Sequence, residues 1–270
     1  MLRRHALRGG GDARQETAMK VDLNSDMGEG FGAWKMGDDA AMLDIVSSAN
    51  VACGLHAGDP EVMANTFRLA KDKGVTVGAH PGYPDLWGFG RRNIPFTIGE
   101  TERLIAYQIG AAQAMAAYSG HAIRYVKLHG ALGNLGQQNR DVALAACRAI
   151  KAVDSRLICL TIALGEMEKA ADEMGLAFRS EIFADRAYTD EGFLVDRRLP
   201  GAVLHEPDEI ARRILSMLEA GAIETVTGKR LKTAIHSICV HSDTPSAVEI
   251  ARALHQSLEG AGVTIQSFVE

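Results

Sequence analysis

The stretch VDLNSDMGEGFG, residues 21–32, decides the fold of this chain. Its first half alternates apolar and polar residues as a β-strand does, and its second half holds three glycines within five residues. Asp22, Asn24 and Asp26 stand at every second position, so in a strand they project from one face. A hairpin turn with solvated acids is the alternative. The acids beside a glycine-rich loop favour one wall of a functional site.

The composition is that of one globular domain. The chain has 270 residues, of which 47% are hydrophobic, enough for one large core. Its net charge of -5, with no run of basic residues, argues against nucleic-acid binding. No apolar stretch approaches the roughly 18 residues of a membrane helix. The four cysteines form no C-x-x-C pair and predict core thiols in a cytoplasmic protein (Cys53, Cys147, Cys159, Cys239).

Residues 1–18 differ from the rest of the chain. They contain four arginines and a Gly-Gly-Gly run but lack the apolar segment of a secretory signal. Asp12 and Glu16 count against a transit peptide. We expect a disordered N-terminal extension over residues 1–18, or a natural start at Met19. Residues 19–270 are expected to form a single β/α-barrel catalytic domain.

Short β-rich runs alternate with helical patterns from Lys20 onward. Helix signals include a pattern over 38–48, a start at Asp59–Pro60, and a capping box formed by Thr97 and Glu100. A hairpin is expected over 225–231 and a peripheral strand over 263–268. The seven main strands are expected at about residues 20–24, 51–53, 75–79, 123–128, 157–162, 177–183 and 235–240.

Strands that alternate with helices imply a parallel sheet, which is either open or closed. Polar residues follow six of the seven expected strands. An open sheet concentrates its site at one switch point, whereas a barrel gathers all its strand ends into one mouth. The sequence therefore predicts an α/β fold, a seven-unit β/α barrel.

Four of the nine histidines directly follow an expected strand, which packing alone explains poorly. The other five are expected to be surface or structural residues (His5, His121, His205, His236, His255). The predicted mouth contains Asp22, Asn24, Asp26, His56, His80, Lys127, His129, Asp185 and His241.

Acids beside histidines suit either a metal ion or acid–base catalysis. Asp26, His56 and His80 are the best trio for a divalent ion, but no H-E-x-x-H motif is present, and acid–base catalysis is favoured. Without a metal, an Asp–His pair can activate water and Lys127 can stabilise an oxyanion. Lys127 facing outward is the alternative, and His129 would share its side of the strand.

The loop Gly88–Arg92 offers backbone donors and two guanidinium groups, Arg91 and Arg92, for phosphate or carboxylate. A flexible surface loop explains it equally well. The sequence has no G-x-x-x-x-G-K-[ST] loop, which argues against an ordinary P-loop ATPase. Helix starts at Asp59–Pro60 and Thr244–Pro245 can direct N–H groups to an anion at the mouth.

Several long motifs resemble one known family over about residues 19–270. These are the runs 21–29, 49–60, 78–85, 88–92, 126–132 and 241–245, which include the segments VDLNSDMGE, ANVACGLHAGDP and GAHPGYPD. They resemble the LamB/YcsF family, whose members are also called the A subunit of 5-oxoprolinase. The resemblance implies a barrel akin to the glycoside hydrolase/deacetylase group.

The resemblance also implies ATP-dependent opening of 5-oxoproline to L-glutamate, together with 5-oxoprolinase subunits B and C. Asp26 with His56 or His80 is then the expected base, and Lys127 and His129 stabilise charge. Arg91 or Arg92 holds phosphate or carboxylate, and the other mouth residues contact substrate or nucleotide (Asp22, Asn24, Asp185, His241). ATP is the expected co-substrate, and a divalent metal is compatible with the site. The alternatives are a metal-dependent deacetylase-like hydrolase and a non-catalytic scaffold subunit.

Overall fold

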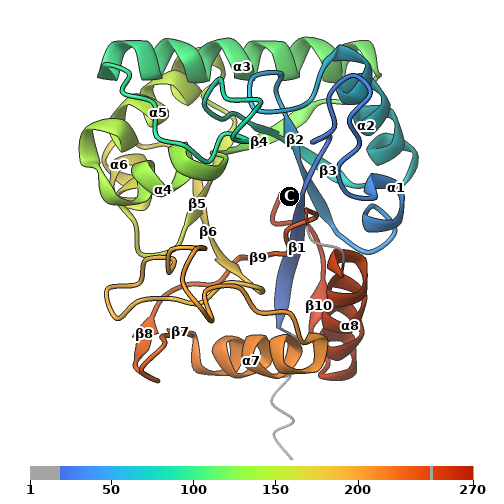
Figure 1. The fold of residues 1–270 in the computed structure, drawn as a ribbon, viewed down its shortest axis with the longest axis vertical. Coiled ribbons are helices and arrows are strands. Elements are labelled where there is room, and N and C mark those ends of the chain that lie inside the picture. The colour runs from blue at the N-terminus through green and yellow to red at the C-terminus, as the bar shows by residue number, and fades with distance from the viewer. Residues whose placement is uncertain (1–18, 244–245, 270) are drawn as a thin grey trace, which may run out of the picture.

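The computed structural model describes residues 19–243 and 246–269. The expected N-terminal extension, and the helix start at Thr244–Pro245, lie outside this range. Seven parallel strands close into a barrel, because the last of them pairs with both β6 and β1 (Figure 1). The seven-unit barrel is thereby confirmed. The strands are β1 (Lys20–Met27), β2 (Ser48–Ala52), β3 (Thr76–His80), β4 (Ile123–Lys127), β5 (Ile158–Ile162), β6 (Phe178–Phe183) and β9 (Ser237–Cys239).

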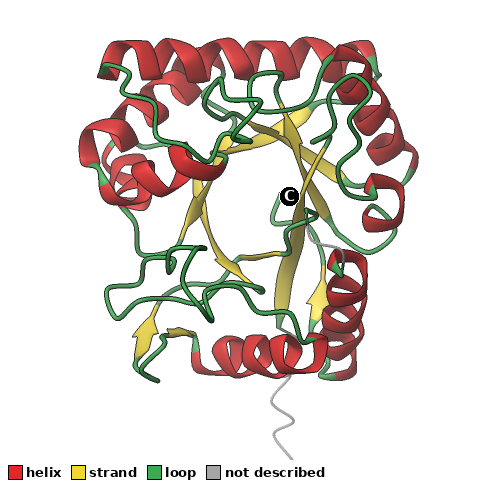
Figure 2. Cartoon of the chain, viewed as in Figure 1, coloured by secondary structure: helices red, strands yellow, loops and turns green. Residues whose placement is uncertain are grey.

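The helices lie outside the ring of strands (Figure 2) and bury their apolar faces against it. The Asp59 cap and the Thr97–Glu100 capping box both form as predicted. Among the described residues, no helix combines the length and the apolar character that crossing a bilayer requires. The helices are α1 (Asp39–Met42), α2 (Pro60–Asp72), α3 (Ile98–Tyr118), α4 (Gly130–Gln138), α5 (Arg140–Val153), α6 (Glu166–Glu173), α7 (Pro207–Ala220) and α8 (Ala247–Gly260).

The interior of the barrel is polar. Along β1, Val21, Leu23 and Met27 belong to the apolar core. Asp22 and the other alternate residues of β1 instead hydrogen-bond to side chains of neighbouring strands; Asn24, for example, bonds to Ser237 of β9. Alternate residues of the strand therefore point to opposite faces. The apolar ones form an outer layer that the helices cover, and the polar ones form a hydrogen-bonded interior.

Two segments differ from the sequence expectation. The helix expected over 38–48 ends at Met42, because Ser47 and Ser48 instead donate their hydroxyls to Asp22 and β2 begins at Ser48. Helix α4 was not predicted, since its glycines have low helix propensity. A Cβ atom at Gly133 would lie 2.7 Å from a backbone carbonyl oxygen, so this glycine permits close packing.

The remaining strands lie outside the barrel. The hairpin forms from β7 (Ala222–Glu224) and β8 (Arg230–Lys232), with Gly228 in the turn. It begins at Ala222, three residues before the expected start at 225. The peripheral strand is β10 (Thr264–Ile265), which pairs with the first residues of β1. The chain beyond β10 packs against interior residues. Phe268 contacts Tyr125 edge-on with ring centroids 5.1 Å apart, and Ser48 donates a 3.3 Å hydrogen bond to Ser267.

A substitution at Gly78 in β3 can test how tightly the barrel interior is packed. A Cβ atom there would lie 2.4 Å from the ring of Tyr125, which is fully buried and donates its hydroxyl to Asn50. We expect Gly78→Ala to destabilise the protein by about 1–3 kcal/mol through overpacking. The matched control is Gly110→Ala on the exposed side of α3, where nothing lies within 4 Å. That change should stabilise the protein by roughly 0.5–1 kcal/mol. Urea unfolding measures both, and equal stabilities of Gly78→Ala and wild type would contradict the packing described.

Candidate active site

Lys127 ends β4 and faces into the barrel, as one of the two predicted orientations requires. Its ammonium group lies 3.0 Å from Asp26 and 3.1 Å from Glu181, and it donates to Cys239 Sγ at 2.9 Å. Burial lowers the pKa of Lys127, but the two carboxylates and the thiol outweigh it and hold the pKa well above its usual value. Lys127 is therefore a permanent positive charge at the centre of the site.

Asp26 is the carboxylate that this charge stabilises most. Burial raises its pKa, but His80 and Lys127 together bring the pKa well below the ordinary range. Asn50 adds a 2.8 Å hydrogen bond to Asp26 Oδ1. Glu181 differs, because burial raises its pKa and Lys127 offsets this only in part. The ammonium group is thus paired chiefly with an ionised Asp26.

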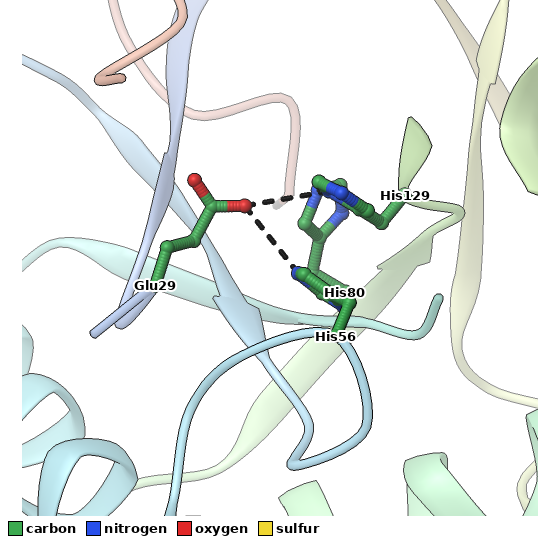
Figure 3. A group of neighbouring side chains, drawn as sticks. All are labelled: Glu29, His56, His80 and His129. Atoms are coloured by element: carbon green, nitrogen blue, oxygen red, sulfur yellow. Dashed lines mark hydrogen bonds and ion pairs between the residues drawn. The ribbon is translucent and has the colours of Figure 1, made fainter. Parts of the chain in front are cut away.

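Three imidazoles gather beside this pair, with one carboxylate from the loop after β1 (Figure 3). Glu29 Oε1 lies 3.4 Å from His56 Nε2 and 3.3 Å from His129 Nδ1. His80 Nε2 lies 3.0 Å from His129 Nδ1 and 3.4 Å from Asp26 Oδ2. All four residues of the group in Figure 3 are buried. Four strand ends and their loops therefore meet at one point, as the barrel prediction required.

His241 follows β9 and forms a second pair on the opposite side of Asp26. Its Nδ1 lies 2.9 Å from both oxygens of Asp185, and its ring stacks on Phe183 at 5.1 Å. Burial raises the pKa of Asp185, but the charge and hydrogen bond of His241 outweigh it and lower the pKa. An ionised Asp185 accepts a hydrogen bond from Nδ1–H, so in the neutral form of His241 the lone pair is on Nε2.

A cavity of about 760 Å³ opens above these groups. Its lining includes Asp26, His80, Lys127, His129 and His241, and also five arginines. The volume lies in the range of small-molecule sites. A positive rim over an acid–base floor suits an anionic substrate. The arginines are Arg91, Arg92, Arg186, Arg197 and Arg198.

The arginines are held to different degrees. Arg91 donates to Asp243 at 2.6 Å and lies over the ring of Phe89. Arg92 is paired with Asp85 and is largely exposed. Arg186 is buried and donates to two backbone carbonyls, and burial with the neighbouring Arg197 lowers its pKa to about 10. Arg91 and Arg186 are the better placed to meet a buried anion.

Most of the predicted site residues come together, but they lie at two depths. Asp26, His80, Arg91, Arg92, Lys127, His129 and His241 line the cavity, and His56 and Asp185 stand directly behind them. Asp22 and Asn24 lie deeper in the barrel, where neighbouring side chains satisfy them. Three of the remaining histidines, His121, His236 and His255, form hydrogen bonds with backbone groups. His205 is exposed, and His5 lies outside the described residues.

Glu29, Glu181 and Arg186 belong to the site but were not predicted from the sequence. Glu29 and Arg186 each follow a strand, so the rule that selected the histidines could have found them. Glu181 carries a weaker signal, since it lies within β6 and not after it. The expected metal trio is rearranged as well. Asp26 contacts His80, whereas His56 belongs with Glu29 and His129.

Within the part of the chain that the structure describes, two groups have enough ligand atoms for a metal ion. One consists of Glu29, His56, His80 and His129, whose ligand atoms all lie within 4.8 Å of one another. The other consists of Asp26, Cys239 and His241. In the second group the Cys239 thiol accepts a hydrogen bond from Lys127, and burial raises its pKa well above the usual value. A thiol held protonated is a poor metal ligand, so the first group fits an ion better.

The closed barrel, with ionisable groups at the carboxyl ends of its strands, places this chain among α/β-barrel proteins with their site at that mouth. The profile of the LamB/YcsF family matches residues 21–270. The chain therefore belongs to the LamB/YcsF family.

Several relatives of similar length are similar to this chain in sequence. It is 58% identical to the A subunit of 5-oxoprolinase from Azorhizobium caulinodans over 92% of this chain and 98% of the relative. It is also 58% identical to the A subunit of 5-oxoprolinase from Gluconobacter oxydans, over 93% and 99%. The crystal structure of a lactam utilization protein from Thermus thermophilus superposes with a TM-score of 0.87 at 42% identity, covering 93% and 100% of the two chains. A protein from Enterococcus faecalis, with a TM-score of 0.55 at 13% identity, shares the fold alone.

The depth of Asp22 gives a prediction about stability. Burial raises its pKa from 3.8 to about 6, although three serine hydroxyls partly offset this. The folded protein therefore favours the protonated form of Asp22. The contribution of this preference to the free energy of unfolding is complete below about pH 4 and is lost as the pH rises through 6. Asn at this position does not titrate. We expect the stability of Asp22→Asn relative to wild type to rise between pH 4 and pH 7 by on the order of 3 kcal/mol. Urea unfolding at the two pH values measures this, and a pH-independent difference would contradict it.

Proposed function

We propose that this chain is the A subunit of a 5-oxoprolinase and takes part in the ATP-dependent hydrolytic opening of 5-oxo-L-proline to L-glutamate. The names of its relatives support a hydrolase of this kind that works as part of a larger assembly. The observation that carries the proposal is the cavity, where an arginine rim lies above a floor that holds Lys127, Asp26 and the Asp185–His241 pair.

The cavity residues supply the parts that the reaction needs. The substrate is a small lactam with one carboxylate, which Arg91 and Arg186 can bind. His241 is suited to accept a proton from water, because Asp185 holds its Nδ1 proton. Asp26 has too low a pKa to be a strong base, so we assign it to holding Lys127 and His80 in place. Lys127 stabilises negative charge that develops at the substrate carbonyl. His129 was expected to share this role, but burial and the neighbouring histidines hold its pKa well below the usual value, and its Nε2–H is donated to the carbonyl oxygen of Phe89.

ATP overcomes the low reactivity of the amide. The lactam oxygen attacks the γ-phosphorus of ATP, ADP leaves with the bridging oxygen, and the phosphorylated ring carbon becomes electrophilic. Water adds to this carbon and the ring nitrogen leaves with the C–N bonding electrons, which yields an acyl phosphate and a free amine. A second water then releases phosphate and gives L-glutamate. The absence of a P-loop motif from the sequence favours a nucleotide site shared with the partner subunits B and C.

The direct test measures glutamate and phosphate release from 5-oxoproline and ATP, with the chain alone and with subunits B and C. We expect activity only in the mixture. In the mixture Asp26→Asn should lose about 100-fold or more of the turnover, as expected for a disrupted catalytic pair, while assembly persists. Asp172→Asn, on the exposed side of α6, is the matched control and should retain wild-type turnover.

Two outcomes would favour the alternatives. Full activity of the Asp26→Asn mixture would indicate a scaffold subunit whose partners perform the chemistry. No glutamate from folded, associated wild-type subunits would overturn the proposal and favour a deacetylase-like hydrolase.

A further inference from the structure

The group of Glu29, His56, His80 and His129 has a hydrogen-bonding conflict. His80 Nδ1 lies 2.8 Å from the carbonyl oxygen of Lys127, and His129 Nε2 lies 2.8 Å from the carbonyl oxygen of Phe89. A carbonyl oxygen only accepts, so each of these nitrogens carries the proton of its ring. In the neutral tautomers, His80 Nε2 and His129 Nδ1 are therefore both acceptors.

These two lone pairs face each other at 3.0 Å, and neither can donate to the other. Carboxylate oxygens flank the pair, with Glu29 Oε1 at 3.3 Å from His129 Nδ1 and Asp26 Oδ2 at 3.4 Å from His80 Nε2. Among the described residues, Glu29 Oε1 has no hydrogen-bond donor. With both imidazoles neutral, four acceptor atoms thus converge on one buried point, and a bound cation can take the place of the proton that would otherwise have to lie among them.

His56 lies beside these acceptor atoms. Its side chain is buried, and neither ring nitrogen has a hydrogen-bond partner among the described residues. Its ring stacks on His129 with centroids 3.6 Å apart and planes inclined by only 6°. An ion in the plane of the His129 ring therefore lies out of the plane of the His56 ring. His56 is thus a neighbour of Glu29 and the ion, not a ligand in this arrangement.

We propose that Glu29, His80 and His129 bind a divalent transition-metal ion of the Zn²⁺ class. Two imidazoles and one carboxylate match the donor preference of such ions, whereas Mg²⁺ and Ca²⁺ prefer oxygen ligands alone. The carbonyl groups of Lys127 and Phe89 fix the tautomer and direction of the two rings, as backbone acceptors do around metal-bound histidines. His80 and His129 also line the cavity, so the ion borders the space where the substrate is proposed to bind.

The experiment uses the full chain, stripped with a chelator and titrated with Zn²⁺ in a calorimeter. We expect one ion per chain and a higher thermal unfolding temperature with Zn²⁺, but no comparable shift with Mg²⁺. Glu29→Gln and His129→Gln should each weaken Zn²⁺ binding by about 100-fold or more. His56→Asn should weaken it by about 10- to 100-fold, as loss of a group around the ligands does. His205→Gln, an exposed histidine, is the control for surface binding and should match wild type.

Circular dichroism of the apo variants confirms that each is folded. Glu29→Asp keeps the carboxylate and should retain more affinity than Glu29→Gln. Two results overturn the proposal: no Zn²⁺ binding by folded wild-type protein, or wild-type Zn²⁺ binding by both Glu29→Gln and His129→Gln. Because metal binding is measured without substrate, either result is independent of 5-oxoprolinase activity in the three-subunit mixture.

Discussion

The buried ammonium group of Lys127 is the interaction on which the rest of the interior depends. It bridges β4 to Asp26 of β1 and to Glu181 of β6, so it joins strands that are not neighbours in the sheet. Taking two acids out of water is costly, and a single positive charge between them offsets much of that cost. Without it, the barrel would enclose uncompensated negative charge.

Asp26 links the Lys127 ammonium group to the histidines. One of its oxygens lies near Lys127 and the other lies near His80, so the pair that stabilises the barrel also borders the site. The Asp185–His241 pair stands on the other side, where β6 and β9 end. The mouth of the barrel therefore combines a rigid, charged floor with loops that carry the arginines. Such an arrangement keeps the reactive groups in place below the arginines.

Much of this architecture could be predicted from local sequence. The strand signal of residues 20–24, the alternation of strands with helices and the polar residues after six of the seven expected strands were enough to predict a barrel with one mouth. Glu181 was missed because it lies within a strand and not after one, and only closure of the barrel brings Lys127 to it. Helix α4 was missed because propensity disfavours glycine, whereas close packing at Gly133 requires it. The pairing of His129 with Glu29 depends on loop geometry, which alternation of apolar residues does not describe.

The contact of Phe268 with Tyr125, together with the pairing of β1 with β9 and β10, has a consequence for biosynthesis. Strand β1 pairs with strands that are made more than two hundred residues after it. Contacts so distant in sequence are slow to form, because the intervening chain must first be ordered. While the chain emerges from the ribosome, the acids of β1 remain in water and cannot yet join a closed interior. Native structure at the mouth therefore arises only after β9 has been made, and until then the edge of β1 that pairs with β9 has no strand beside it.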